Sequence, residues 1–460
     1  MARAGLLEKT TDTAGLTTFY TYNSDGTVRA AVQYERDDTS SPVKAEVAYT
    51  YDGLGRIIKT GRGNGVATET EFTAAHQIKH EKTTRGGEVI TEAAYLYDTH
   101  NNLTQRTDTR PAASQDGTGT PGPAASTTTR YTYDAHNRLT SSAVSGDGGQ
   151  KLTTTAYTLN VSGDITRTET TTHTGDHAGQ TRVTENGIDS AGRLTTLTTT
   201  TTGGGGGNDS NGDGSGTVRK QVFDTDGNLT TGHDSTRWTY SLHGQPATHT
   251  TPDGHTTTYT YWADGTRATT TQQAPGGNGS SAPQEKTTFY YTPDGTLLND
   301  THTTSTSQEG ADPAAAASTQ ETTTASYLLA GTRHARTLTG ASADTAAATG
   351  AGYMLQDRHG STTALTTSND GQVTQAWQYT DYGQAAGPDG TPHTPGTHPA
   401  PAEGQPAPEH SPRTPAGAAR QPFTYAGEYT DPTGTQYLRA RLYDPATGRF
   451  TTPDPAPQHN

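Results

Sequence analysis

The chain has 460 residues, a formal net charge of −15 at pH 7 and a hydrophobic share of only 28%. So little apolar sequence is typical of disorder, but 23 tyrosines in a threonine-rich chain favour β-strands, because both residue types suit a pleated, half-buried surface. The acidic balance argues against a nucleic-acid-binding surface, no apolar run is long enough for a membrane span, and the absence of cysteine excludes disulfides and thiolate metal sites.

The first residues, MARAGLLEKTTD, contain no long apolar stretch and therefore no signal peptide. The chain opens within a repeat pattern, so we expect it to be a fragment of a longer protein.

A repeated unit dominates the chain: a strand with tyrosines two residues apart, an Asp or Asn, a short turn and a second strand. The clearest copies are YTYNSDGTV at Tyr20, YTYDGLGRI at Tyr49, YLYDTHNNL at Tyr95 and YTYDAHNRL at Tyr131. Weaker copies begin at Gly187, Val222, Tyr259 and Phe289. Residues two apart on a strand point to the same face, so the paired tyrosines predict an aromatic stripe.

Each turn of the repeat has two predicted key positions. A carboxylate at its start can accept hydrogen bonds from backbone N–H groups two residues on, and these aspartates are Asp52, Asp98, Asp134 and Asp224. A positive φ is expected later in the turn, at Gly55, Asn102, Asn137, Gly192 and Gly227. The next strand is expected to begin at Leu103, Leu139, Leu194 and Leu229. The alternative, that these aspartates bind metal or act in catalysis, is disfavoured by the regular spacing.

Two polar segments interrupt the repeats. The Thr- and Gly-rich stretch from Thr195 to Gly216 is expected to form an expanded loop. The Pro- and Gly-rich stretch from Gly387 to Arg420 is expected to be a disordered insertion, because proline excludes a sheet interior. We therefore divide the chain into a repeat shell over 1–352, the start of a core-like region over 353–385, the insertion over 386–421 and a truncated C-terminal core over 422–460.

Candidate ligand sites are few. The stretch DSNGDG from Asp209 has the spacing of a calcium loop, but Lys220 occupies the position where an EF-hand needs a bidentate Glu. The histidines show no metalloprotease spacing. Trp238 and its neighbours could stack on a sugar, although they serve equally well as core residues. We expect no metal and no cofactor.

The C-terminal stretch YLRARLYDPATGRF, from Tyr437 to Phe450, alternates along its first half. Alternation predicts one strand with Tyr437, Arg439, Arg441 and Tyr443 on one face and Leu438, Ala440 and Leu442 on the other. Asp444 and Pro445 then predict a turn that Gly448 allows to return, which completes a hairpin with Arg449 and Phe450. The arginines are expected to cover aromatic rings or to pair with carboxylates.

The Tyr-x-Tyr-Asp units resemble the YD repeats of the Rhs family. The segments from Tyr353 to Gly383 and from Pro422 to Pro455 are similar to the Rhs repeat-associated core. This family includes bacterial polymorphic toxins of interbacterial competition, the C subunits of insecticidal Tc complexes and, more distantly, teneurins. The resemblance implies an all-β fold: a long antiparallel sheet of hairpins that spirals into a hollow shell, with a C-terminal core plug.

The resemblance also implies function. Family shells enclose a C-terminal toxin domain, which is absent from this chain, and an immunity protein or secretion machinery would be further partners. The full-length protein is expected to be secreted or displayed on the cell surface. A threonine-rich interior would hold a loosely folded cargo without adhering to it, and the net charge of −15 would favour a basic cargo.

Family members often cleave themselves after the core, through aspartates in paired Asp-Pro-x-Gly motifs. Only Asp454, followed by Pro455, matches the first motif, and Pro457 replaces its glycine. The second motif and the scissile bond would lie beyond Asn460, so we expect no enzymatic activity from this chain itself. Two other hypotheses remain: a carbohydrate-binding adhesin, with Trp238 or Trp262 in the site, and an autoprotease that is incomplete here.

Overall fold

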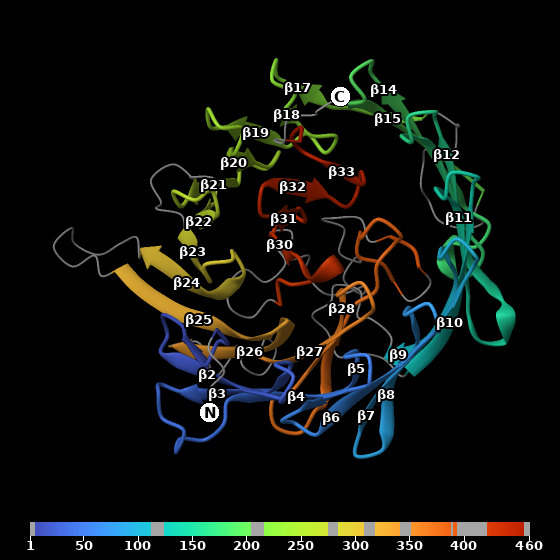
Figure 1. Ribbon diagram of the computed structural model, residues 1–460. Helices are drawn as coiled ribbons and strands as arrows, with labels where there is room; N and C mark the ends of the chain where they lie inside the picture. Colours follow the sequence, from blue (N-terminus) through green and yellow to red (C-terminus); the bar gives the residue numbers. More distant parts are fainter. Residues whose placement is uncertain are drawn as a thin grey trace, which may run out of the picture.

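The computed structural model describes residues 5–111, 124–203, 216–274, 284–307, 318–340, 351–387, 390–392 and 421–454. Two long antiparallel sheets curve into a ring, and a small third sheet lies inside it (Figure 1). In the two large sheets every strand pairs with its neighbours in sequence, so the wall is a continuous meander. The predicted all-β fold, with long antiparallel sheets around a hollow interior, is confirmed.

The first sheet has 16 strands. They are β1 (Lys9–Thr11), β2 (Leu16–Tyr22), β3 (Val28–Glu35), β4 (Ala45–Tyr51), β5 (Ile57–Arg62), β6 (Val66–Phe72), β7 (Ile78–Arg85), β8 (Glu88–Tyr97), β9 (Leu103–Pro111), β10 (Ala124–Tyr133), β11 (Leu139–Ser145), β12 (Lys151–Leu159), β13 (Ile165–Thr172), β14 (Thr181–Ile188), β15 (Leu194–Thr202) and β16 (Thr217–Lys220). Two 3₁₀ turns, η1 (Asp147–Gly149) and η2 (Gly175–His177), lie between its strands.

The second sheet has 13 strands. They are β17 (Val222–Phe223), β18 (Leu229–Thr231), β19 (Arg237–Tyr240), β20 (Pro246–Thr250), β21 (Thr256–Tyr261), β22 (Arg267–Gln273), β23 (Gln284–Tyr291), β24 (Leu297–Ser307), β25 (Ser318–Ala330), β26 (Thr332–Gly340), β27 (Gly352–Gln356), β28 (Thr362–Thr366) and β29 (Val373–Ala376). The third sheet, which follows η3 (Tyr425–Gly427), has β30 (Tyr429–Thr430), β31 (Gln436–Leu438), β32 (Arg441–Asp444) and β33 (Arg449–Phe450).

The repeat turns have the predicted aspartate chemistry. In five of these turns, one carboxylate oxygen accepts the backbone N–H groups two and four residues on, as Asp134 does from His136 and Arg138 at 2.9 and 3.0 Å. The same pair of bonds is made by Asp52, Asp98, Asp189 and Asp224. The aspartates thus close turns, and the strands after these turns begin at the predicted leucines, Leu103, Leu139, Leu194 and Leu229.

One turn prediction is wrong by a single residue. Positive φ occurs at Gly55, Asn137, Gly192 and Gly227 as expected, but in the turn after Tyr97 it occurs at Asn101, with φ of 68°, and not at Asn102. Asn102 instead donates its backbone N–H and its side-chain amide to the two carboxylate oxygens of Asp98, both at 2.9 Å. It therefore has the role that Arg138 has in the next repeat, where Nε donates to Asp134.

The expected loop from Thr195 to Gly216 is partly a strand. Its threonine run belongs to β15, which pairs along its length with β14 and through four residues with β16. β-branched threonine packs well on a pleated surface, so a run of threonines extends the strand. The DSNGDG stretch and most of the predicted insertion over 386–421 lie outside the described residues, and the predicted domain boundaries stay predictions.

The two large sheets contact one another where β3 and β4 lie against β25 and β26 (Figure 1). Ala31, Ala45 and Val47 of the first sheet pack against Leu328 and Ala335 of the second in one buried cluster. Polar contacts extend this junction, since the backbone N–H of Glu46 donates to the Tyr353 hydroxyl at 2.8 Å and the Asn64 amide donates to the Thr366 hydroxyl at 3.0 Å. Segments about 300 residues apart in the chain are thereby joined.

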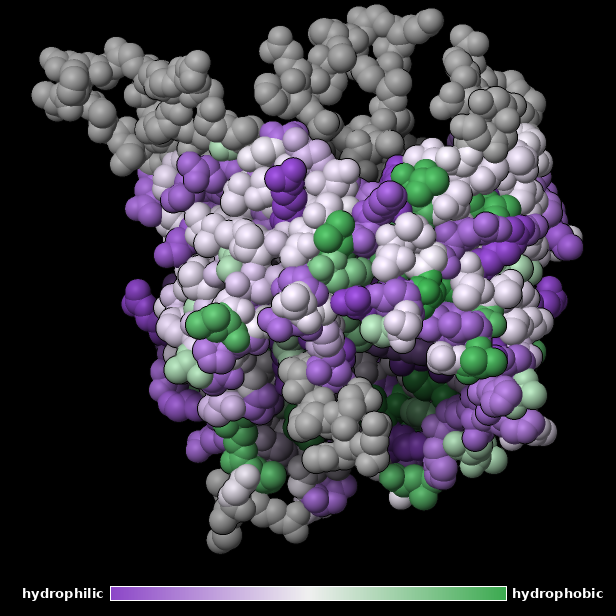
Figure 2. Space-filling view, turned by 90° about the horizontal axis from the view of Figure 1, so that it is seen from above, coloured by the Kyte–Doolittle hydropathy of each residue, from purple (hydrophilic) through white to green (hydrophobic). Residues whose placement is uncertain are grey.

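The face seen in Figure 2 is mostly hydrophilic or neutral, with small, separated hydrophobic patches. The largest apolar core lies inside the ring, where β30–β33 pack on the inner face of the second sheet. Buried aromatic rings from both parts form it, among them Trp238, Tyr259, Phe289, Tyr429 and Tyr437. The C-terminal sheet therefore lies next to the second sheet, and the loops after β27 and β29 lie between it and the first sheet.

Candidate functional site

A cavity of about 1360 Å³ lies between the inner face of β9–β16 and the C-terminal part of the chain. The loops that follow β27 and β29 and the turn between β32 and β33 form its other side. Pockets for small molecules usually measure about 300–1,000 Å³ and are lined mainly by apolar groups. This cavity is larger, and its wall contains many hydroxyl groups.

Threonine is the commonest residue type in the wall. Facing strands present them in pairs, such as Thr155 with Thr170 at 3.3 Å and Thr184 with Thr199 at 3.2 Å. Alternation along each strand turns every second residue inward, so a threonine-rich strand gives a hydroxyl-rich face. The threonines of β10–β15 that line the cavity are Thr127, Thr129, Thr153, Thr155, Thr168, Thr170, Thr172, Thr184, Thr199 and Thr201. The predicted aromatic stripe contributes Tyr131 and Tyr133.

A buried ion network joins this wall to the loop after β27. Arg106 Nε lies 2.7 Å from Asp108 Oδ2, Arg110 Nη2 lies 2.5 Å from Asp108 Oδ1, and Arg106 Nη1 lies 3.3 Å from Asp357 Oδ2. Burial alone would raise the pKa of Asp108, but the two guanidinium groups lower it below its ordinary value. These charges therefore hold the loop against β9.

The sequence stretch TQRTDTRP contains a signal for this network that the repeat analysis missed. Arg106, Asp108 and Arg110 are two residues apart, so they share a strand face, and opposite charges on one face can pair. Nothing in the pattern indicates that this face points inward, because the outward face is polar as well.

Asp381 joins the loop after β29 to the same wall. Its Oδ2 accepts hydrogen bonds from the Ser142 hydroxyl at 2.5 Å and from the Tyr157 hydroxyl at 2.8 Å. Burial raises the pKa of this carboxyl above its ordinary value, although both hydroxyl donors oppose the rise. The Tyr157 ring also meets the Tyr382 ring edge-on, with centroids 5.4 Å apart.

The C-terminal sheet is anchored to the second sheet by a buried ion pair. Arg267 Nη1 lies 2.5 Å from Asp431 Oδ1, and the two side chains are 1% and 3% exposed. The guanidinium also covers the Tyr437 ring at 4.0 Å, and the Arg267 backbone N–H donates to the Tyr437 hydroxyl at 2.8 Å. Tyr437, the first residue of the C-terminal motif, thus fixes the plug to the wall.

The predicted strand from Tyr437 to Tyr443 is wrong. The chain turns back at Arg439, which has φ of 59°, and at Ala440, whose N–H donates to Leu438 O at 2.7 Å. β31 and β32 are therefore two strands of a tight hairpin, with Tyr437 opposite Leu442. Both residues face the core, whereas simple alternation placed them on opposite faces.

The rest of the motif folds largely as expected. β32 and β33 form a hairpin in which the Gly448 N–H donates to Asp444 O at 2.8 Å, and Gly448 has φ of 68°. Pro445 follows Asp444 in the turn and lines the cavity. The Arg441 guanidinium covers the Phe450 ring at 3.7 Å, which is the expected cation–π contact.

Arg449 connects the C-terminal sheet to the first sheet. Its Nη1 donates to Gly192 O at 2.8 Å and its Nη2 donates to Asp164 Oδ1 at 2.9 Å. Burial raises the pKa of Asp164, but Asn160 and Arg449 outweigh this and lower it. The arginine therefore binds two turns of the repeat wall.

The candidate autoprotease aspartate lies close to this hairpin. Asp454 Oδ2 is 3.7 Å from Arg441 Nη2, and the Asp454 side chain is 43% exposed. Asp444 has different neighbours: its Oδ2 accepts from the Thr447 hydroxyl at 2.8 Å and lies 3.8 Å from His233 Nδ1. Burial raises the pKa of Asp444. Each carboxylate has its own structural contacts, and a catalytic role for Asp454 stays a prediction.

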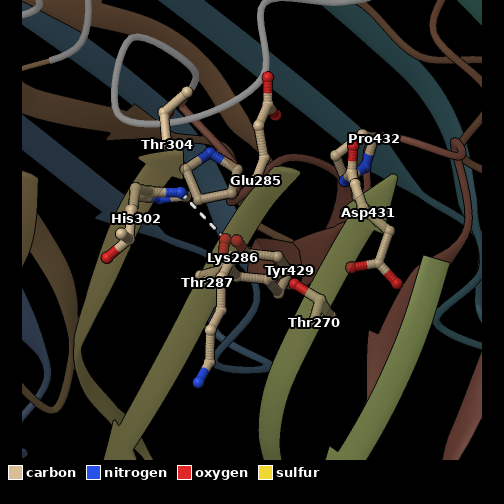
Figure 3. Close-up of a pocket in the computed structure, with 12 residues that line it drawn as sticks. Thr270, Glu285, Lys286, Thr287, His302, Thr304, Tyr429, Asp431 and Pro432 are labelled. Carbon is tan, nitrogen blue, oxygen red and sulfur yellow. Dashed lines mark hydrogen bonds between the residues drawn. The ribbon is translucent and has the colours of Figure 1, made fainter. Parts of the chain in front are cut away.

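A second, much smaller pocket lies where β22–β24 meet the C-terminal segment (Figure 3). The Thr287 hydroxyl is 3.0 Å from His302 Nδ1, and His302 Nε2 is 2.8 Å from Asp300 Oδ1, the order of a nucleophile, a base and an acid. The pocket measures about 20 Å³, which is room for one water molecule. We interpret Thr287 and His302 as structural partners of Asp300, which also accepts a hydrogen bond from the Tyr327 hydroxyl at 2.6 Å.

The two tryptophans proposed for an adhesin differ in exposure. Trp238 is 5% exposed and packs between His249 and Tyr259, so it is a core residue. Trp262 is 44% exposed, and its Nε1 donates to Phe289 O at 3.1 Å. A sugar could therefore stack only on the second of these two rings.

No helix among the described residues is long and apolar enough to cross a membrane. Among the same residues, no three His, Asp or Glu side chains are placed to hold a metal ion together.

The sequence matches no protein-family model and no curated protein. In structure, the chain is similar to the crystal structure of TcdB2-TccC3, with a TM-score of 0.68, 18% identity, and an alignment covering 97% of this chain and 20% of that one. It is also similar to a Tc holotoxin pore from Photorhabdus luminescens with a mutation in TccC3, with a TM-score of 0.65, 16% identity, and coverage of 98% and 20%. The chain thus spans about a fifth of the length of both neighbours. At this identity the likeness shows a shared fold: the chain is an all-β protein built like part of TcdB2-TccC3.

Proposed function

We propose that this chain forms part of a shell that encloses a polypeptide, as the shells of Rhs/YD-repeat toxins enclose their toxin domain. The observation that carries the proposal is the cavity of about 1360 Å³ with a hydroxyl-lined wall. The Tyr-x-Tyr-Asp repeats and the fold shared with a Tc holotoxin component support it.

The chemistry of the wall suits such a cargo. An apolar wall would gain free energy by burying apolar side chains of the cargo and would hold it tightly. Threonine hydroxyls can exchange hydrogen bonds with a passing backbone without that gain, so a loosely folded segment would be retained but not fixed. The strands of the wall pair side by side around the ring, which keeps most strand edges away from the cargo.

In this proposal the cargo is a C-terminal toxin domain of the longer protein, which is secreted or displayed on the cell surface. An immunity protein and secretion machinery would be its further partners. The chain would act by enclosure and not by catalysis, and self-cleavage at Asp454 would require a longer chain.

Protection from proteolysis tests the proposal. A reporter segment with a cleavage site for a sequence-specific protease would be joined after Asn460. The same segment would be inserted after Val161, a turn residue that is fully exposed at 101%, as the matched control. We expect cleavage after Asn460 to be about tenfold slower than at the Val161 insertion, because only an enclosed site must open before it is cut. Equal rates would contradict enclosure.

A further inference from the structure

The wall of the large cavity has a local charge opposite to that of the whole chain. The chain carries −15, yet arginines outnumber aspartates among the residues that line the cavity. The lining arginines are Arg106, Arg110, Arg182, Arg219 and Arg358, and the lining aspartates are Asp108, Asp357 and Asp381. An occupant contacts the wall, so this local balance matters more to it than the net charge.

The aspartates are already engaged by the wall. Asp108 and Asp357 pair with Arg106 and Arg110, and Asp381 is a buried carboxyl bound by two hydroxyls. Arg358 lies over the Tyr95 and Tyr97 rings, 5.7 Å from each. Arg182 and Arg219 remain, and in the described part of the chain neither forms an ion pair with a carboxylate.

Arg182 and Arg219 occupy one corner of the cavity. Arg182 on β14 is opposite Thr201 of β15, and Arg219 on β16 is opposite Leu197 of the same strand. Thr199 is two residues from each of these partners, so it shares their face and lies between the two arginines. All five residues line the cavity, and both arginine side chains are exposed to it.

This placement has an electrostatic cost that an anion would remove. Partial burial and then the like charge of Arg219 lower the pKa of the Arg182 guanidinium below its ordinary value. A carboxylate between the two arginines would replace repulsion by attraction, and the effect is larger in a partly enclosed site than in bulk water.

We propose that this corner binds an acidic stretch of the enclosed polypeptide, with its Asp or Glu carboxylates on Arg182 and Arg219. Guanidinium groups bind carboxylates through two parallel hydrogen bonds, and the hydroxyls of Thr184 and Thr199 can bond the adjacent backbone. This inference rests on the proposed enclosing function and adds the chemistry of the cargo segment.

A polypeptide suits the site better than a nucleic acid. A polyanion as long as a nucleic acid would meet the field of a chain with a charge of −15, whereas a short acidic segment meets mainly the local positive corner. The net charge alone would favour a basic cargo, and the corner instead selects acidic residues at this point of the wall.

The absence of cysteine makes a direct test feasible. A Thr199→Cys variant places one thiol between the two arginines. It would be equilibrated with three peptides, each joined through one cysteine to the same small thiol by a disulfide, that differ only in carrying Glu, Gln or Lys. The thiolate of the variant attacks the peptide's sulfur and the small thiol leaves, and the yields of mixed disulfide would be measured by mass spectrometry. We expect the Glu peptide to be favoured over the Lys peptide by about tenfold, with less difference in high salt.

Matched variants locate the effect. Arg182→Gln with Arg219→Gln should bring the three yields close together, whereas Arg130→Gln, an exposed arginine that follows the cavity-lining Thr129, should change nothing. Attachment of all three peptides without preference would overturn this inference and leave the enclosure proposal standing. Failure of every peptide to attach would show that the cavity admits no polypeptide and would overturn both.

Discussion

Arg267 shows how a single residue holds the C-terminal sheet in the ring. Its guanidinium contacts Asp431, in the turn between β30 and β31, and the ring of Tyr437 on β31. Removing one charge of a fully buried pair leaves the other without compensation, whereas removing both charges avoids that penalty. The ion pair therefore specifies the position of the C-terminal sheet more than it raises the free energy of unfolding.

We predict that Asp431→Asn lowers the free energy of unfolding by about 3–5 kcal/mol. The double variant Arg267→Met with Asp431→Leu should be more stable than Asp431→Asn, as measured by urea unfolding. Glu69→Gln, which breaks an exposed pair with Lys59, is the control and should cost less than about 1 kcal/mol. A double variant that is less stable than Asp431→Asn would contradict this account.

Glu81 on β7 gives the ring a dependence on pH. Burial raises the pKa of its carboxyl from 4.5 to about 7, although the Tyr95 hydroxyl donates to it at 3.1 Å. The folded chain thus binds this proton more tightly than the unfolded chain, so the stability it contributes is present below pH 4.5 and is lost as pH rises through about 7.

We therefore predict that Glu81→Gln increases the free energy of unfolding at pH 8 by about 3 kcal/mol and changes it little at pH 4. Urea unfolding at the two pH values would measure this. Glu88→Gln, at a glutamate whose side chain is 76% exposed, is the matched control and should have no such dependence. An equal effect of Glu81→Gln at both pH values would show that the carboxyl is not perturbed.

At the scale of the element, two neighbouring asparagines in the turn after β8 have different roles. Asn101 has positive φ, a conformation that costs glycine nothing, while Asn102 donates twice to Asp98. We predict that Asn101→Gly is neutral or slightly stabilising and that Asn102→Gly costs about 1 kcal/mol. Thermal unfolding of the two variants would decide, and the reverse order would restore the assignment made from the sequence.

The repeat elements could be predicted from the sequence because they are local. Asp134, its turn and the strand that begins at Leu139 lie within a few residues, and the same chemistry recurs along the chain. The hairpin at Arg439 was missed because alternation continues through it, and no Gly, Asn or Pro marks the turn. The sequence also did not indicate which face of each strand points into the cavity, because threonine occurs on both faces and the two faces do not differ in polarity.

At the scale of the whole molecule, closure of the ring depends on contacts that no local pattern contains. Val47 meets Leu328 and Ala335 in one buried cluster, and Tyr49 donates to Ala330 O at 2.5 Å, across about 280 residues of chain. On the other side, Arg449 joins the C-terminal sheet to the turns at Asp164 and Gly192. These contacts curve the long meander into a ring that has an inner face.

The central claim is that this wall encloses a polypeptide, and a cryo-EM map of the full reading frame tests it most directly. We predict a curved β wall that follows the described residues and surrounds density belonging to a different segment of the chain, in contact with the face of β9–β15. A cavity closed by the side chains of the wall itself, or an open sheet without enclosed density, would contradict the account.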